Sequence, residues 1–353
     1  MHVFSDFRIV QDLRVRHREL GVACSEVHLS RAVPCAELLE LLAEAPASAD
    51  ALEAIYGRTK PRLAAWLEEC ADATRDIYDL PSLPLIEANR ELLRKQAAWV
   101  AATAPALGTP NPGFLRRVDV ALERLQAALS SAERRRAEPV HGARQIGRLP
   151  LMDGVTPRGF ASSATRAPKP DDDAPYVDHE RFYAMNFLQE VQAADSCAAL
   201  LFDAPDMPWD FYFDAARHMW DESRHSMFGQ KKLIALGIPL SGVALSSTAY
   251  RLRQTLAPHD RYAALTTQEA DAFPGKHQGL KEALRHNDAL GSMTWSYDIA
   301  DETQHVRYGQ KWLGPLAKAM GDPRSVDQVK ADAENWRATV LKVSYSSPAT
   351  TAG

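Results

Sequence analysis

Apolar residues return every three or four positions along most of this 353-residue chain, which is the pattern of helices that bury one face. In the N-terminal part, the pattern predicts helices from Pro34 onward, over 59–77 and 85–103, and from Pro112 onward. Residues 1–30 fit a strand pair or a helix equally well. Because Trp66 and Trp99 lie on the apolar stripes, both are expected in the core.

The helical pattern stops between residues 138 and 178, where prolines, glycines and the acidic run at 171–173 interrupt it. A stretch of this length without periodicity is typical of a connection that wraps the surface or covers a site. We therefore expect an N-terminal, mostly helical domain over 1–137 and a long covering linker over 138–178.

The pattern returns as four long amphipathic segments, which predict helices over 178–202, 208–236, 259–273 and 288–320. Gly237 and Pro239 are expected to end the second helix, and Pro274 with Gly275 to end the third. A short helix is expected within 247–256. Residues 179–320 thus form one helical domain, followed by a C-terminal helix and a flexible tail over 321–353.

Two of the four segments contain the same motif, Asp-Glu-x-x-His. It occurs as Asp221-Glu222-Ser223-Arg224-His225 and again as Asp301-Glu302-Thr303-Gln304-His305. Side chains three positions apart share one face of a helix, so each glutamate can hold a metal ion together with its histidine.

Glutamate is scarce in this half of the chain, although it is a favoured surface residue of helices. Between residues 181 and 320 it occurs only at Glu190, Glu222, Glu269, Glu282 and Glu302. Glu190 and Glu222 flank a turn at 205–208, and Glu269 and Glu302 flank a second turn at 285–288. Two helical hairpins bent at these turns would bring each pair of carboxylates to the same depth.

The motifs resemble those of the ferritin-like di-iron carboxylate superfamily, and most closely a group of bacterial ferritin-like proteins of unassigned function. The resemblance covers roughly residues 175–320 and includes Asp206-Met207-Pro208 at the first turn, as well as Gly309 and Trp312 after the second motif. It implies an all-α chain with a ferritin-like four-helix bundle after the N-terminal domain. By this resemblance the metal ligands, which are also the catalytic residues, are Glu190, Glu222, His225, Glu269, Glu302 and His305.

Further polar residues share the faces of these ligands. Asp298 lies four residues before Glu302, and Asp221 and Asp301 lie beside the ligands, where they fit imidazole-binding carboxylates and surface ion pairs equally well. His218 is interpreted as a hydrogen-bonded bundle histidine or an additional ligand. Tyr183 and Tyr262, on the stripes of Glu190 and Glu269, are expected to line a pocket.

Composition narrows the function. The net charge of −5 argues against a nucleic-acid-binding surface, and no apolar run is long enough to span a membrane. The four cysteines, Cys24, Cys35, Cys70 and Cys197, lack the paired spacing of zinc or redox motifs, and no signal pattern begins the chain. We therefore expect a cytoplasmic protein with reduced thiols.

Four carboxylates and two imidazoles suit two iron ions, or manganese or a mixed manganese–iron pair. The first hypothesis is a di-iron oxidase or oxygenase that uses dioxygen as co-substrate to oxidise a small organic molecule, as a monomer or homodimer, with electrons from a donor protein or the substrate. The alternatives are ferritin-like iron oxidation and storage, a tRNA-modifying hydroxylase, and a bundle that binds no metal.

Overall fold

The computed structural model describes residues 2–19, 33–73, 81–130, 161–163, 169–204 and 207–341. Within these residues the chain is all-α, as predicted, apart from one pair of three-residue strands. The chain divides near residue 150 into an N-terminal and a C-terminal unit, each with hydrophobic clusters of its own. No helix in the described ranges has the length and apolarity required to cross a membrane.

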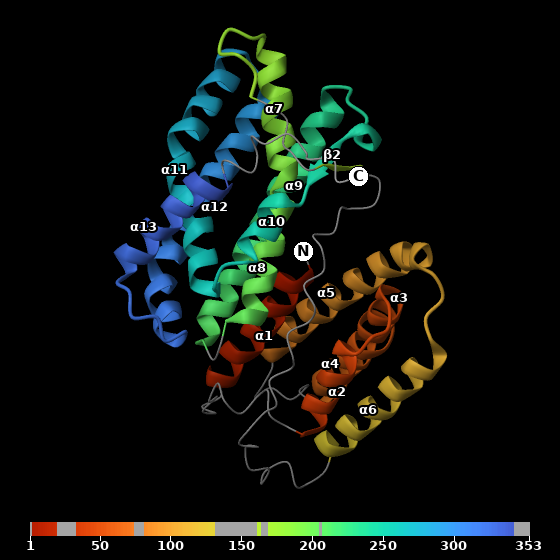
Figure 1. The fold of residues 1–353 in the computed structure, drawn as a ribbon. Coiled ribbons are helices and arrows are strands. Elements are labelled where there is room, and N and C mark those ends of the chain that lie inside the picture. The colour runs from red at the N-terminus through yellow and green to blue at the C-terminus, as the bar shows by residue number, and fades with distance from the viewer. Residues whose placement is uncertain are drawn as a thin grey trace, which may run out of the picture. The chain divides into compact units, whose positions relative to one another are not determined.

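The described residues of the N-terminal unit are helical and are coloured red to yellow in Figure 1. The question left open for the first residues is decided in favour of a helix over 2–19. The elements are α1 (His2–Glu19), α2 (Val33–Ala43), α3 (Ser48–Leu52), the π-helical η1 (Glu53–Thr59), α4 (Lys60–Ala73), α5 (Ser82–Thr103), the 3-10 turn η3 (Ala104–Leu107) and α6 (Pro112–Ser130).

Within this unit α2 packs on α6 and α4 packs on α5, so the apolar stripes meet in pairs. Phe114, Val118 and Leu122 of α6 are buried against Leu38 and Leu41 of α2. Trp66 packs at the margin of this cluster, as expected for a core residue. The expectation for Trp99 is wrong, because 55% of its surface is exposed and its ring contacts that of His2 edge-on.

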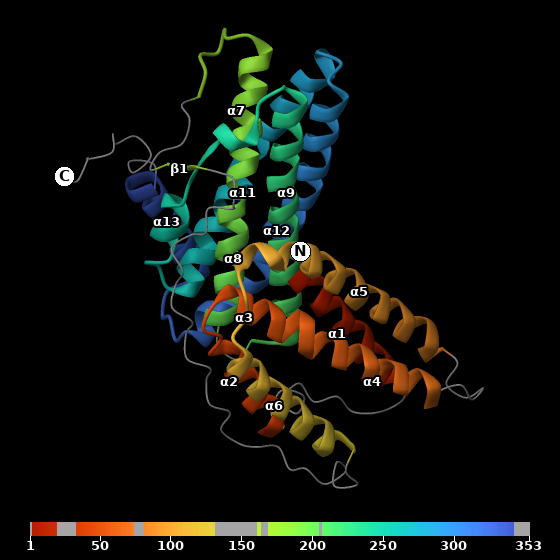
Figure 2. The same ribbon diagram turned by 90° about the vertical axis from the view of Figure 1, so that its right-hand side faces the viewer.

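The C-terminal unit contains four long helical segments that run side by side in both views (Figures 1 and 2). In chain order its elements are β1 (Ala161–Ser163), α7 (Tyr176–Gln189), α8 (Val191–Asp203), α9 (Trp209–Ala235), η5 (Leu240–Gly242), β2 (Ala244–Ser246), α10 (Thr248–Arg253), α11 (Pro258–Arg285), α12 (Ala289–Ala319), α13 (Val326–Trp336) and η6 (Arg337–Leu341). Helix α9 packs on α7, α8 and α12, and α12 packs on α11.

The first predicted helix is divided in two. Glu190 forms a turn between α7 and α8, and no proline or glycine marks the place in the sequence. Helix α8 continues the course of α7 (Figure 1), so the break leaves the path of the chain largely unchanged.

The connection between α11 and α12 lies where the sequence predicted a turn. Asn287 adopts a left-handed conformation with φ of 54°, and the Asp288 side chain caps α12 by accepting a hydrogen bond of 2.8 Å from the Gly291 amide. The other predicted turn, at 205–208, includes residues 205 and 206, which lie outside the described residues.

The prediction that Pro274 and Gly275 end the third helix is wrong. Helix α11 continues through both residues to Arg285. Proline removes one backbone hydrogen bond, but the carbonyl that loses its partner belongs to Ala270, an exposed residue whose carbonyl water can satisfy. The packing of α11 along α12 offsets the remaining cost.

The predicted linker over 138–178 lies mostly outside the described residues. Its strand β1 pairs in parallel with β2, with Ala161 opposite Ala244, and helix α7 already begins at Tyr176. The predicted C-terminal helix is present as α13 with the π-helical η6, and the predicted flexible tail beyond residue 341 also falls outside the description.

Candidate metal centre

The six candidate ligands are brought together between α7–α8, α9, α11 and α12, in two clusters whose ligand atoms lie within 4.8 Å of one another. The "His305 cluster" is His218, Glu222, Glu269 and His305, and the "His225 cluster" is Glu190, His225, Asp298 and Glu302. All eight side chains are buried except Glu190, which is half-buried.

The two motif histidines turn the same nitrogen toward the carboxylates. His225 Nδ1 lies 3.3 Å from Glu190 Oε2, and His305 Nδ1 lies 3.4 Å from Glu222 Oε1. Since an imidazole nitrogen must be unprotonated to bind a metal, the geometry assigns that task to Nδ1 in both rings.

The other nitrogen of each ring faces the aspartate of the opposite motif. His225 Nε2 donates to Asp301 Oδ2 at 3.2 Å, and His305 Nε2 donates to Asp221 Oδ2 at 3.4 Å. Both aspartates are buried, so they do more than form surface ion pairs. A carboxylate that accepts from Nε2 fixes the tautomer in which Nδ1 has its lone pair free.

Two arginines complete this outer layer. Arg217 Nε donates to Asp221 at 2.8 Å, and Arg224 lies 2.7 Å from Asp221 and 3.3 Å from Asp301. These contacts offset part of the cost of burying two aspartates. Asp221 and Asp301 therefore accept hydrogen bonds from the imidazoles and also pair with arginines, but as buried groups and not as the surface ion pairs that the sequence also allowed.

Glu222 lies between the two clusters. Its Oε1 is 3.4 Å from His305 Nδ1, and its Oε2 is 3.8 Å from His225 Nδ1. Glu302 belongs to the His225 cluster, and its Oε2 also lies 3.8 Å from His305 Nδ1. Both carboxylates have the placement that a bridge between two ions requires.

His218 adds a third imidazole to the pair supplied by the motifs. Its Nε2 lies 2.9 Å from Glu269 Oε1 and 3.2 Å from Glu222 Oε1, and its ring stacks on His305 with 3.7 Å between centroids. His218 is thus both hydrogen-bonded, as the sequence favoured, and within reach of the same space as His305.

Lys276 was missed by the sequence analysis. Its Nζ donates to both oxygens of Asp298 at 2.8 Å and to Glu302 Oε1 at 2.9 Å. The signal was its spacing of seven residues from Glu269, which places both on one face of a continuous helix. The expected helix end at Pro274 concealed that signal.

The two tyrosines occupy different surroundings. The ring of Tyr183 packs edge-on against Trp295 with 5.1 Å between centroids. Tyr262 is buried with its ring 6.3 Å from that of His218, and burial raises the pKa of its hydroxyl. Of the two, Tyr262 lies near the His305 cluster.

Several ligand atoms are buried with no hydrogen-bond partner among the described residues. Orphaned buried polar atoms are rare, because each costs about 1–3 kcal/mol. Five of them belong to the six candidate ligands: Glu190 Oε2, His225 Nδ1, Glu269 Oε2, Glu302 Oε2 and His305 Nδ1. His218 Nδ1, in the His305 cluster, is a sixth. Their convergence is the observation that a bound cation would explain, so the residues present fit a metal centre.

Charge gives a second test of that fit. The clusters contain five carboxylates and are contacted by one ammonium, that of Lys276, which leaves four negative charges when all are ionised. Two divalent cations balance that charge. Carboxylate oxygens with imidazole nitrogens suit iron and manganese.

Burial shifts the pKa values of several cluster residues toward the protonated form. Burial raises the pKa of Glu190 and Asp298, and burial, opposed by Lys276 and assisted by Glu269, raises the pKa of Glu302 to about 7. Burial lowers the pKa of His225, but the neighbouring carboxylates of Asp301 and Glu190 outweigh it and hold that pKa well above its usual value. Protons bound to Glu190, Asp298, Glu302 and His225 would therefore compete with a cation for these sites.

A third group of potential ligands, His259, Asp260 and Asp322, shows the contrast. Arg324 lies 2.7 Å from Asp260 Oδ1 and its Nε donates to both Asp322 oxygens at 3.0–3.1 Å. An arginine already supplies the positive charge, so this group requires no metal ion.

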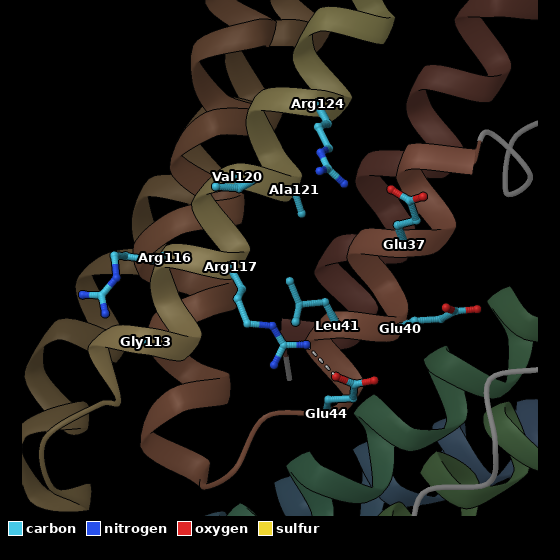
Figure 3. A pocket seen from close by; sticks show the side chains of 10 residues that line it. All are labelled: Glu37, Glu40, Leu41, Glu44, Gly113, Arg116, Arg117, Val120, Ala121 and Arg124. Carbon is cyan, nitrogen blue, oxygen red and sulfur yellow. Dashed lines mark hydrogen bonds and ion pairs between the residues drawn. The ribbon is translucent and has the colours of Figure 1, made fainter.

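Two surface grooves differ in their surroundings. One, of about 560 Å³, lies between α2 and α6, where Arg117 points toward Glu44 at 2.9 Å while Arg116 points away (Figure 3). The other, of about 520 Å³, lies between α9 and α12, and the ring of its lining residue Phe228 is 5.7 Å from that of His225. Only the second groove adjoins the clusters.

Comparison with known proteins adds no assignment: no protein-family model, no curated protein and no solved structure matches the chain.

Proposed function

We propose that the protein is a ferritin-like dinuclear metalloenzyme that uses dioxygen to oxidise a small organic substrate, with iron as its metal and manganese or a mixed pair as the alternative. The five orphaned ligand atoms carry the proposal. The helices support it, because the α7–α8 junction and α11 each supply a glutamate, and α9 and α12 each supply a Glu-x-x-His pair. That is the ligand arrangement of ferritin-like di-metal bundles.

Each ligand has a distinct role in this proposal. Glu222 and Glu302, which lie between the two clusters, would be shared by the two ions, and His225 and His305 would each hold one ion through Nδ1. Glu190 would complete the surroundings of one ion and Glu269 those of the other. Asp221 and Asp301 keep the imidazole proton on Nε2, so that Nδ1 remains a ligand.

Iron held by these groups would supply the electrons and Lewis acidity needed to activate dioxygen. The chain contributes a site from which water is largely excluded, since His218, His225 and His305 are fully buried. A dry site strengthens the attraction between carboxylates and ions and protects reactive species from water. The electrons that return the iron to its reduced form would come from a donor protein or from the substrate.

The groove between α9 and α12 is the best candidate for the substrate. Its lining is mostly apolar and includes Trp220, Met227, Phe228, Ile234, Met293 and Tyr297. A small apolar molecule bound there is separated from His225 by the Phe228 ring. This groove favours an enzyme over iron storage, which needs no organic-substrate site, and a native mass of a dimer or smaller would exclude a storage cage.

The test is metal analysis of the full-length protein purified without chelator. We expect about two irons or manganese ions per chain, and loss of most of them in Glu222→Ala and His305→Ala. Glu282→Ala and His277→Ala, at residues of α11 outside both clusters, are the matched controls and should keep the metal. Full metal content in both ligand variants would refute the assignment.

A second readout connects the metal to the reaction. Protein loaded with ferrous iron should consume dioxygen, and His305→Ala should not. If metal binds at the predicted ligands but dioxygen is not consumed, the centre stands and the oxidative function does not.

A further inference from the structure

Lys276 makes the two clusters chemically different. The His225 cluster contains one imidazole and is contacted by the Lys276 ammonium, whereas the His305 cluster contains two imidazoles. The lysine hydrogen bonds fall on Asp298 and on Glu302 Oε1, both of which belong to the His225 cluster. A divalent ion entering that cluster therefore meets a positive charge already in place.

We infer that Lys276 orders metal binding: the first divalent ion binds at the His305 cluster, and the His225 cluster accepts the second only when the ammonium leaves Glu302. The inference rests on the proposed dinuclear centre and goes beyond it by distinguishing its two halves.

The contacts of Glu302 show why one of its oxygens is available to a metal ion, whereas the other is already bound by Lys276. Glu302 Oε2 has no hydrogen-bond partner among the described residues and lies 3.8 Å from His305 Nδ1, so it can bind the first ion as it stands. Glu302 Oε1 is held by Lys276 at 2.9 Å. When a carboxylate bridges two ions with one oxygen on each, the second ion bound by Glu302 needs Oε1, and it must displace the lysine from that oxygen.

Asp298 remains an ion-pair partner for the Lys276 ammonium when its contact with Glu302 is lost. Lys276 already contacts both Asp298 oxygens at 2.8 Å, so loss of the Glu302 contact leaves an intact buried ion pair. With that pair retained, the four remaining carboxylates, Glu190, Glu222, Glu269 and Glu302, balance two divalent ions. The ammonium thus shifts toward Asp298 rather than leaving the interior.

The test is equilibrium dialysis of the metal-free, full-length protein against Mn²⁺, which stays divalent in air. Wild type is expected to bind one ion per chain tightly and a second ion with a dissociation constant at least about tenfold higher. The reason is that the Lys276 ammonium and the second ion, both positive, repel each other strongly at close distance in a partly dry site. Lys276→Met removes the charge and nearly keeps the length of the side chain, so it should tighten the second step about tenfold or more.

Three variants keep the result interpretable. Lys276→Met together with Asp298→Asn removes both members of the ion pair, avoids a buried unpaired aspartate, and should also tighten the second step. Glu269→Ala should remove the tight ion, whereas Glu190→Ala should remove only the weak one.

Two equal ions in wild type would overturn the inference, as would an unchanged second step in both lysine variants or loss of the tight ion in Glu190→Ala. Failure of the dinuclear centre itself would look different: neither wild type nor any variant would bind Mn²⁺, which would overturn both proposals together.

Discussion

Asp301 and Asp221 decide which nitrogen of each motif histidine faces the ligand groups. Each accepts from the Nε2 of a histidine on the other helix and each contacts Arg224. The aspartate that precedes the glutamate of one motif thus accepts a hydrogen bond from the histidine of the other motif. The repeated Asp-Glu pair in the sequence therefore has a structural reason in both copies.

Asp301→Asn should lower metal affinity by about 10–100-fold, the usual effect of losing a carboxylate behind a histidine ligand. The amide keeps the size of the side chain but removes the charge that fixes the Nε2–H tautomer. Competition with a chelator measures the change. Asp271→Asn, at an exposed residue paired with Arg337, is the control and should bind metal as wild type does. Equal affinities in the two variants would contradict this role.

At the scale of single residues, the sequence indicated which side chains gather in the two clusters, but it did not indicate all of the contacts that they make. Glu190 and Glu269 could be chosen because glutamate is rare in this half of the chain. The contacts of Lys276 could not be foreseen, since they depend on a helix continuing through Pro274. Asp298 was placed on the right face, but only the packing of α12 against α11 shows that it binds an ammonium.

Among the elements, α7 and α9 approach each other most closely at Gly229. A Cβ added there would lie 2.4 Å from the backbone oxygen of Ala184 and 2.4 Å from the backbone nitrogen of Leu188. Backbone atoms cannot yield as a side chain can. Only glycine at this position allows α9 to pack against α7 at its observed distance.

Two glycine substitutions should therefore have opposite effects. Gly229→Ala is expected to lower the free energy of unfolding by about 1–3 kcal/mol, since the added methyl overpacks the interface. Gly275→Ala, inside α11 with nothing within 4 Å of the added carbon, should raise it by about 0.5–1 kcal/mol, because alanine is the better helix former. Chemical denaturation measures both, and a stabilising Gly229→Ala would contradict the observed packing.

Helix boundaries were predicted well where local chemistry sets them and poorly where packing does. The left-handed Gly237 after α9 and the capping Asp288 before α12 are local signals, and both helices end or begin within a residue or two of the expected place. The turn at Glu190 and the passage of α11 through Pro274 depend on neighbouring helices. No property of those residues alone predicts them.

For the whole molecule, the two units have separate hydrophobic clusters, and the candidate centre belongs entirely to the C-terminal one. Its ligands come from α9, α11, α12 and the α7–α8 junction, so bound ions would connect all four segments. The stability of this unit should then depend on metal, while that of the N-terminal unit should not.

Calorimetry should accordingly show two transitions, of which a chelator lowers one. The effect should be larger at pH 8 than at pH 6. The pKa of Glu302, raised to about 7 in the fold, exceeds its ordinary value, so the metal-free fold gains stability from the bound proton at low pH and loses that gain as the pH rises through 7. Metal binding compensates for the resulting repulsion. A chelator effect that is equal at both pH values would contradict this account.

The crossed contacts between the two motifs also bear on how the protein folds. The hydrogen bonds from His225 to Asp301 and from His305 to Asp221 join residues 76 and 84 positions apart in the chain. Helices form from neighbours within about a microsecond, but closing segments this long is slower and entropically costly. Under the proposed function, a nascent chain would lack the complete ligand set until synthesis has passed the second motif, so metal binding would come late in folding.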